Sequence, residues 1–119
     1  MEQSLYERLG GTEGIERIAN DTVENHLENP RIVSRYVNSD LDKAKRNLAD
    51  FVITGTGGPN VYKGREMIPT HKGMNISDNE FMAAVDDVMA ALTQSGIGDR
   101  EKGEMLFILY SLRPEVVGI

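Results

Sequence analysis

The chain has 119 residues, a net charge of −6 and no cysteine, and 39% of its residues are hydrophobic. We therefore expect a single folded domain over residues 1–119. The acidic balance disfavours nucleic-acid binding, and the lack of cysteine excludes disulfides, zinc fingers and thiol catalysis. With only two histidines, a multi-ligand transition-metal site is disfavoured as well.

No stretch is apolar for about 18 consecutive residues, so a membrane span is not expected. The first residues, Met1-Glu2-Gln3-Ser4, are acidic and polar, unlike those of a signal peptide. The sequence therefore predicts a cytoplasmic protein that binds neither nucleic acid nor membrane. No pattern in the chain indicates an oligomer, and a monomer is expected.

The first predicted helix is short and has a clear start and end. Ser4 and Glu7 have the Ser-x-x-Glu spacing of a capping box. Gly10-Gly11 ends the helix, because glycine readily leaves the helical conformation. Thr12 follows and is predicted to cap the second helix.

The second predicted helix ends at Asn29-Pro30, because proline disfavours helix in the residue before it. Thr22 and His26 lie at the edge of its apolar stripe. Arg31 to Tyr36 reads as a short helical connector. The stripe consists of Ile15, Ile18, Ala19, Val23 and Leu27.

A third helix is predicted to start at Ser39-Asp40, and Gly55, Gly57, Gly58 and Pro59 are predicted to end it. The segment from Asn60 to Glu66 shows no periodicity and reads as an extended loop. A long irregular loop inside a compact domain needs a reason, which a bound cofactor would supply. The apolar face of the helix consists of Leu41, Ala44, Leu48, Phe51 and Val52.

One of the two histidines, His71, stands on a short predicted turn that Gly73 can end. A capping box at Ser77 and Glu80 then starts the next helix. A neutral imidazole on such a bracketed turn is a good axial ligand for haem iron. By itself, however, a lone histidine is more often a surface residue or a hydrogen-bonded core residue.

The helix that starts at Ser77 is the most regular of the chain, and Gly96 and Gly98 end it. Asp99 is predicted to cap a last helix, which Pro114 ends. No strand pattern competes with these helices, so the fold class is all-α. The inward face of the Ser77 helix consists of Phe81, Val85, Val88, Met89 and Leu92, and that of the last helix of Met105, Ile108, Leu109 and Leu112.

The order of these features resembles the group I truncated haemoglobins over nearly the whole chain, from Leu5 to about Leu112. The resemblance implies a two-over-two helical sandwich around haem b, with His71 as the proximal iron ligand. The matching landmarks are Leu5-Tyr6, Leu9-Gly10-Gly11, Gly57-Gly58-Pro59, Tyr62-x-Gly64-x-x-Met67, His71-Lys72-Gly73 and Ile76-Ser77 before Phe81.

The chain departs from this family at the distal positions. Where the family usually has a Phe-Tyr pair in the second helix, this chain has Thr22-Val23. At the distal positions where the family often has a glutamine or another polar residue, it has Ala44 and Leu48. The usual phenylalanine after the second helix is Tyr36. The hydrogen bonds that usually stabilise bound oxygen are therefore expected to be missing.

Two side chains could take over the distal role. The hydroxyl of Tyr36 could point towards the bound ligand, or it could bond to the backbone in the core. His26 lies one turn beyond Val23 on the same helix. It could bind the iron as a sixth ligand, donate a distal hydrogen bond, or be structural. These alternatives stay open from the sequence.

Further contacts with haem follow from the resemblance. Lys43, Lys45, Arg46, Lys63 and Lys72 could each pair with a haem propionate, although each such residue is more often a solvated surface charge. Lys43 is favoured among them, because the family often carries a basic residue there. Ile108 is a further candidate for the apolar wall. The predicted cofactor contacts are Tyr36, Lys43, Ala44, Leu48, Phe51, Tyr62, Met67, His71, Ile76, Phe81 and Val85.

Three classes of function follow. The first is a haem protein that binds oxygen, carbon monoxide or nitric oxide, with a reductase as a candidate partner and a nitric-oxide dioxygenase-like side activity as an open question. The second is electron transfer or redox sensing through an iron with two histidine ligands. The third is a helical interaction module without cofactor. A visible spectrum of the reduced protein separates the three.

Overall fold

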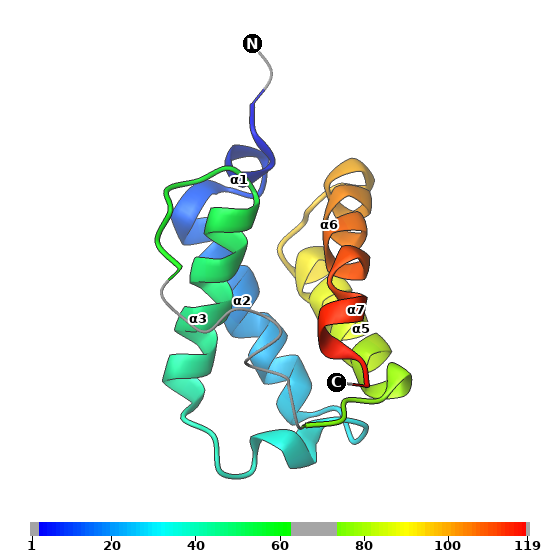
Figure 1. Cartoon of the computed structure of the whole chain (residues 1–119). Coiled ribbons are helices and arrows are strands. Elements are labelled where there is room, and N and C mark those ends of the chain that lie inside the picture. The colour runs from blue at the N-terminus through cyan, green and yellow to red at the C-terminus, as the bar shows by residue number, and fades with distance from the viewer. Residues whose placement is uncertain (1–2, 63–73, 119) are drawn as a thin grey trace.

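The computed structural model describes residues 3–62 and 74–118 (Figure 1). In this part of the chain there is no strand, only an isolated parallel bridge between Ile76 and Val117. The prediction of an all-α fold is therefore confirmed. The helices are α1 (Leu5–Arg8), α2 (Gly11–Leu27), the 3-10 helix η1 (Val33–Tyr36), α3 (Leu41–Gly55), α5 (Asp78–Gln94), α6 (Asp99–Ser111) and α7 (Arg113–Val116).

Three of the predicted helix starts carry the expected side-chain caps. Ser4 caps α1, and at the start of α3 the carboxylate of Asp40 accepts a hydrogen bond from the amide of Lys43, at 3.1 Å. Ser77 and Glu80 form a complete capping box at the start of α5. The Ser77 hydroxyl accepts from the Glu80 amide at 3.0 Å, and the Ser77 amide donates to the Glu80 carboxylate at 3.1 Å. These contacts satisfy amides that a helix start leaves unpaired.

The predicted cap at Thr12 is wrong. The N-cap of α2 is Gly10, in a left-handed conformation with φ of 101°, so α2 begins before Thr12. The Tyr6 hydroxyl takes over the capping role, because it accepts a hydrogen bond from the Thr12 amide at 3.1 Å. The Thr12 hydroxyl lies 2.6 Å from the same oxygen. A side chain of the preceding helix α1 thus replaces the local cap. The capping pattern of the sequence does not reveal this partner.

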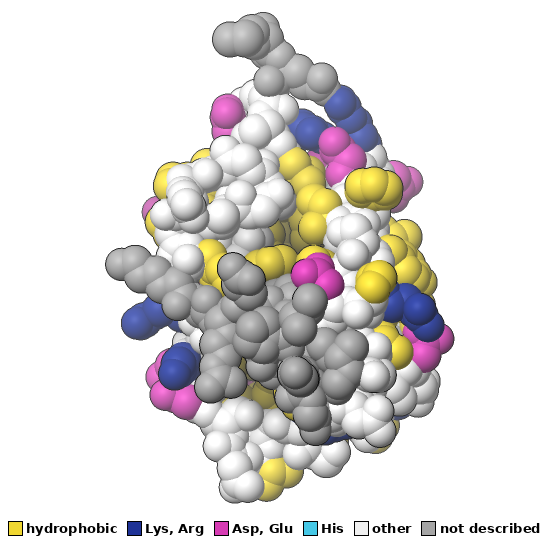
Figure 2. All heavy atoms as spheres, viewed as in Figure 1, with side chains coloured by type: hydrophobic (Ala, Val, Ile, Leu, Met, Phe, Trp, Pro, Cys, Tyr) yellow, Lys and Arg dark blue, Asp and Glu magenta, His cyan; other side chains and the backbone are white. Residues whose placement is uncertain are grey.

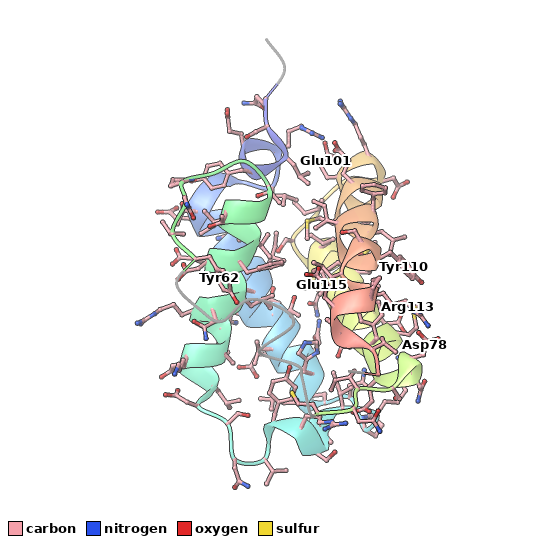
Figure 3. The ribbon with its side chains drawn as sticks, viewed as in Figure 1. Tyr62, Asp78, Glu101, Tyr110, Arg113 and Glu115 are labelled. Atoms are coloured by element: carbon pink, nitrogen blue, oxygen red, sulfur yellow. The ribbon has the colours of Figure 1, made fainter. Side chains whose placement is uncertain are left out.

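The C-terminal end also differs from the prediction. Gly98 is the N-cap of α6, and Asp99 is its first helical residue. Pro114 does not only follow α6 but lies in the first turn of a further short helix, α7, where its missing amide hydrogen is tolerated. Arg113 Nε donates to Asp78 Oδ1 at 2.8 Å, and Figure 3 shows this contact joining α7 to the start of α5.

Helix α2 is the centre of the arrangement. It packs against α3 on one side and against α5 on the other, while α6 packs on α5 (Figure 1). Within the described residues α3 has no extensive packing contact with α5 or α6. No described helix is both long and apolar enough to span a bilayer. Two helix pairs thus face each other, as expected for a two-over-two sandwich.

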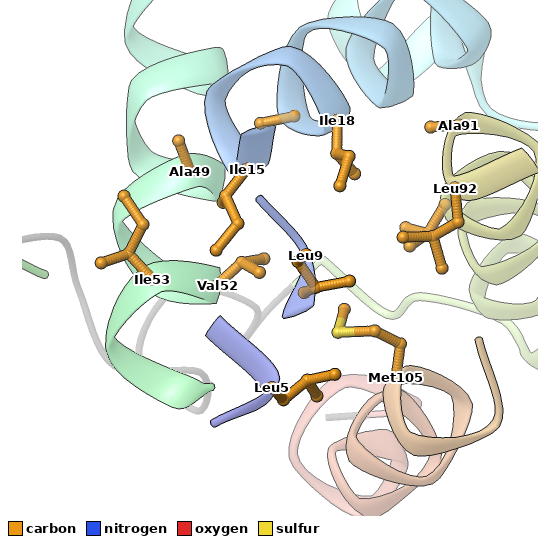
Figure 4. Packing of buried hydrophobic residues seen from close by; sticks show 12 residues of the cluster. Leu5, Leu9, Ile15, Ile18, Ala49, Val52, Ile53, Ala91, Leu92 and Met105 are labelled. Atoms are coloured by element: carbon orange, nitrogen blue, oxygen red, sulfur yellow. The ribbon is translucent and has the colours of Figure 1, made fainter. Parts of the chain in front are cut away.

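The main core lies where α1, α2, α3, α5 and α6 meet (Figure 4). Leu9, Ile15, Leu92 and Met105 are among the largest fully buried side chains. Each such side chain contributes about 1.5–3 kcal/mol when it leaves water. The core is formed by Leu5, Leu9, Ile15, Ile18, Ala19, Ala49, Val52, Ile53, Val88, Ala91, Leu92 and Met105.

The glycines after α3 allow α1 to dock on the end of that helix. A Cβ atom at Gly58 would lie 2.5 Å from Cδ2 of Tyr6 and 2.9 Å from the carbonyl oxygen of Ile53, so only glycine fits there. The neighbouring Gly57 has φ of 101°, which favours glycine as well. The Tyr6 amide also donates to the carbonyl oxygen of Thr56 at 2.9 Å.

Candidate functional site

An apolar cavity lies between α2, α3, α5 and α6. Figure 2 shows hydrophobic side chains around a hollow between the α3 and α6 sides of the molecule. The Thr22 hydroxyl on its wall donates to the Ile18 carbonyl at 2.8 Å, so its hydrogen is used inside α2. The walls include Ile18, Thr22, Leu48, Phe51, Val88, Met105, Ile108 and Leu109.

Three of the predicted contacts, Leu48, Phe51 and Ile108, meet in this apolar cavity. Tyr62 packs edge-on against Phe51, with ring centroids 5.5 Å apart, and Figure 3 shows it beside α3. The Thr54 hydroxyl accepts from the Tyr62 amide at 3.2 Å and so holds the chain after α3 against that helix. The structure therefore places Tyr62 against Phe51, and of these two rings Phe51 lines the cavity.

A second pocket, which we call the η1 pocket, lies between η1, residues 74–76, the start of α5 and α7, and it is open to solvent on one side. It brings together Tyr36, Ile76 and Phe81, all predicted contacts of the cofactor. Val85 is buried beside Phe81 and Ile76 rather than on the wall of this pocket. The remaining wall is formed by Ile32, Arg35, Ser39, Met74, Glu80, Ala84 and Val116.

A charged pair lies on the wall of the η1 pocket. Arg35 donates two hydrogen bonds to the Glu80 carboxylate, at 2.6 and 3.0 Å. These bonds, followed by the hydrogen bond from the Ser77 amide, lower the pKa of Glu80 to about 2. The same pairing raises the pKa of Arg35. The pair ties η1, and with it Tyr36, to the first turn of α5.

His26 makes a buried polar contact across the α2–α5 interface. Its Nδ1 lies 2.7 Å from Oδ2 of Asp87, and the two side chains are only 7% and 12% exposed. Asn29 donates to both carboxylate oxygens, at 3.2 and 3.1 Å. Asn25 donates to the Asp87 carbonyl at 3.1 Å. One carboxylate thus holds the end of α2 and the connector that follows it; we call His26, Asn29 and Asp87 the Asp87 cluster.

Tyr36 joins the Asp87 cluster to the η1 pocket. Its ring stacks on the His26 ring, with centroids 5.4 Å apart and an angle of 26° between the planes. Burial, and then the charge of Asp87, raises the pKa of the Tyr36 hydroxyl above its ordinary value. The hydroxyl therefore stays protonated at neutral pH and can donate a hydrogen bond.

Comparison with known proteins identifies the fold. Residues 4–117 match the family described as bacterial-like globin. This chain belongs to the bacterial-like globin family. It is 30% identical over 116 residues to the group 1 truncated hemoglobin of Tetrahymena pyriformis, an alignment that covers 98% of this globin and 96% of that protein. The resemblance to group I truncated haemoglobins is thereby confirmed.

Solved structures agree with this assignment. The crystal structure of truncated hemoglobin from Tetrahymena pyriformis in the Fe(III) form has a TM-score of 0.94 at 30% identity, over 98% of this globin and 100% of that chain. The 2/2 hemoglobin from Synechococcus sp. PCC 7002, in the cyanomet state with covalently attached heme, has a TM-score of 0.90 at 25% identity, over 97% of this globin and 98% of that chain. The two-over-two helical sandwich is therefore confirmed.

Haem is the cofactor that this family implies, and the residues present fit it. The inner face of α3 presents Leu48 and Phe51, which protein atoms bury only in part. Across from them, α5 and α6 present Val88, Ile108 and Leu109 to the same apolar cavity. A flat apolar ring system finds matching walls here. Because α3 has no extensive packing contact with α5 or α6 in the described chain, a cofactor can lie between them.

The other predicted site residues have mixed outcomes. Lys43 and Arg46 are exposed on α3, and Ala44 is half-buried on the same helix without lining either pocket. Lys45 instead pairs with Glu24 at 2.7 Å. Met67 and His71, together with Lys63 and Lys72, lie outside the described residues. Their roles stay predictions.

Sequence reasoning missed Asp87 and placed His26 only at the edge of the apolar stripe, although His26 is buried. A signal for Asp87 was present. It lies four residues from both Ala83 and Ala91, which are completely buried on α5. A charged residue between two buried alanines on one helix face is expected to have a buried partner. The spacing does not say that the partner is on α2.

Proposed function

We propose that this globin is a haem protein that binds a small diatomic gas, namely oxygen, carbon monoxide or nitric oxide, with His71 as the proximal ligand. The observation that carries the proposal is the apolar cavity between α2, α3, α5 and α6, in a chain of the globin family. Its walls are almost entirely apolar and offer no charged side chain among the described residues. Such a space suits an uncharged gas better than a polar substrate.

The roles of the chain's own residues follow from their places. When bound, haem supplies an iron atom at which a small gas can be held. Leu48 and Phe51 would contact the cofactor from α3, with Ile108 opposite them on α6. Lys43 is exposed near the start of α3, where it can pair with a propionate. His71 would hold the iron through an imidazole nitrogen.

Tyr36 is the side chain that we assign to the distal hydrogen bond. Val23, Ala44 and Leu48 carry no polar hydrogen, and the Thr22 hydroxyl already donates to the Ile18 carbonyl within α2. The Tyr36 hydroxyl is protonated, and its ring lies on the wall of the η1 pocket. A hydrogen bond from Tyr36 would stabilise a bound oxygen, which carries partial negative charge.

A second function is supported by the geometry of His26. Its Nδ1 is engaged by Asp87, as metal-binding histidines usually engage a carboxylate with the nitrogen that does not bind the metal. Nε2 would then be the nitrogen available to iron, giving the bis-histidine protein for electron transfer or redox sensing. A reduced protein with sharp, split visible bands and no added ligand would favour this function over gas binding.

The test of the proposed function is a titration of the haem-free protein with hemin, followed by its Soret absorbance. We expect one hemin per chain in the parent protein. His71→Ala should lose haem or bind it loosely, whereas His26→Ala should retain it. A parent protein that takes up no hemin would contradict the proposal and leave the cofactor-free interaction module. A His71→Ala protein with full haem and an unchanged spectrum would remove His71 as the proximal ligand.

A further inference from the structure

The contacts around His26 indicate how the position of Tyr36 is fixed by a residue outside the distal site. Tyr36 lies on η1, and the only buried hydrophobic side chain among residues 28–36 is Ile32. Polar contacts must therefore fix much of this segment. Two such contacts run from Asn29 to the carboxylate of Asp87, and His26, just before this segment, contacts the same carboxylate.

We propose that Asp87 is a positioning residue of the ligand site, acting through His26 to fix the ring of Tyr36. The proposal rests on the proposed function, because the orientation that Asp87 gives to Tyr36 matters only if the Tyr36 hydroxyl donates to the bound ligand. Asp87 itself touches neither the η1 pocket nor the apolar cavity.

The first step of this chain of contacts is the imidazole. Asp87 accepts from Nδ1 of His26 at 2.7 Å, so the carboxylate selects the tautomer with hydrogen on Nδ1 and fixes the plane of the ring. Both side chains are almost fully buried. If the carboxylate is lost, the Nδ1 hydrogen of His26 is left buried without an acceptor. That loss costs stability, and the imidazole ring is then expected to rearrange.

The second step is the phenol ring. Tyr36 stacks on His26 at 5.4 Å with 26° between the planes, so a rotated imidazole would displace it. Asn29 closes the arrangement, because it donates to both oxygens of Asp87 and its own side-chain oxygen accepts from the Arg31 amide at 3.1 Å. The same carboxylate thus holds the segment that leads to Tyr36 at two points.

A carboxylate is needed because both oxygens accept hydrogen bonds. In Asp87→Asn one oxygen becomes an NH2 group, which donates and cannot accept, so His26 and Asn29 no longer both find an acceptor on each side of the group. The variant keeps the size of the side chain but loses one acceptor. The neighbouring Asp86 provides a matched control, since its pair with Arg31 lies at the surface, with 59% and 37% of the two side chains exposed.

The experiment combines NMR with oxygen kinetics. In the diamagnetic, carbon monoxide-bound ferrous protein, Asp87→Asn should shift the ring resonances of Tyr36, and Asp86→Asn should leave them in place. Asp87→Asn should also raise the oxygen off-rate about threefold, the size of a modest coupling between contacting residues. In a Tyr36→Phe background the same substitution should leave the off-rate unchanged. Asn29→Ala should reproduce the Tyr36 shifts, should Asp87→Asn fold poorly.

The outcomes separate this inference from the proposed function. Tyr36 resonances that neither Asp87→Asn nor Asn29→Ala moves would overturn the positioning role, and so would an off-rate effect that persists in the Tyr36→Phe background. If the ring moves but Tyr36→Phe leaves the off-rate of the parent protein unchanged, the positioning role holds and the distal role of Tyr36 fails. The ring shifts are also measured in the haem-free protein, so a failure to bind haem would not hide the result.

Discussion

Two successive turns of α2 make different contacts with the interior: one is apolar and the other makes a buried polar contact. At Thr22 the hydroxyl donates back to the Ile18 carbonyl, so the helix presents an apolar wall to the cavity. At His26, one turn later, the side chain depends on Asp87 of α5. The apolar region therefore needs only shape and volume, whereas the polar region needs one particular partner. We expect mutations in the two regions to differ accordingly.

The largest effect is expected where the polar region loses its shared acceptor. Asp87→Ala should lower the free energy of unfolding by about 3 kcal/mol, because the buried His26 loses its partner and the half-buried Asn29 loses its acceptor. Urea unfolding measures the loss. Asp86→Ala should cost less than about 1 kcal/mol, since its ion pair with Arg31 is exposed. Equal losses in the two variants would show that burial of Asp87 has no special importance.

The next largest effect is expected when a polar group is introduced into the apolar region. Leu48→Gln places a hydrogen-bond donor on the wall of the apolar cavity. Oxygen release should slow about tenfold if the amide donates one hydrogen bond to the ligand. Stopped-flow mixing measures the rate, and Leu48→Met, which keeps the wall apolar, should leave it almost unchanged. A similar change in both variants would mean that side-chain shape, not polarity, sets the rate.

A smaller effect concerns acid stability. The pKa of Glu80 is lowered from 4.5 to about 2, mainly by Arg35, so the pair stabilises the fold above pH 4.5. Protonation removes this contribution progressively as the pH falls from about 4.5 to about 2. Since the Arg35 and Glu80 side chains remain partly exposed, solvent screening keeps the contribution below about 1 kcal/mol.

Unfolding followed between pH 2 and pH 6 tests this prediction. Glu80→Gln should flatten part of the decline in stability towards low pH, whereas Glu28→Gln, on an exposed residue, should reproduce the parent curve. If both variants follow the parent curve, the Arg35–Glu80 pair does not contribute to stability in solution.

The smallest effect is expected at Thr22. Thr22→Val should change the free energy of unfolding by less than about 0.5 kcal/mol, because among the described residues the hydroxyl bonds only within its own helix. Thr22→Ala additionally removes buried methyl packing and should cost about 1 kcal/mol. Thermal unfolding of both variants compares the two losses. A Thr22→Val protein as unstable as Thr22→Ala would show that the hydroxyl has a second partner.

The sequence was a good guide to local structure. The caps at Ser4, Asp40 and Ser77 depend on neighbours within three residues, so their spacing predicts them. Apolar periodicity likewise predicts the inward faces, such as Leu48 and Phe51 on α3. The predicted cap at Thr12 was wrong because the capping oxygen belongs to Tyr6, which lies on another helix.

Only part of the candidate site was predictable from the sequence. The apolar residues and Tyr36 follow from helix faces and from the family resemblance. The partner of His26 does not, because Asp87 is 61 positions away and only the packing of α2 on α5 brings them together. Periodicity indicates which face of a helix is buried but not which residue lies across from it. The assignments of Met67 and His71 stay predictions of the sequence.

The account depends most on Tyr36 as the distal donor, and its oxygen off-rate tests this directly. Tyr36→Phe removes only the hydroxyl and should raise the off-rate about tenfold, the effect of losing one good hydrogen bond. Tyr110→Phe, which removes a hydroxyl from a tyrosine that is 42% exposed on α6, should leave the rate unchanged. An off-rate that is the same in the parent protein and in Tyr36→Phe would contradict the account.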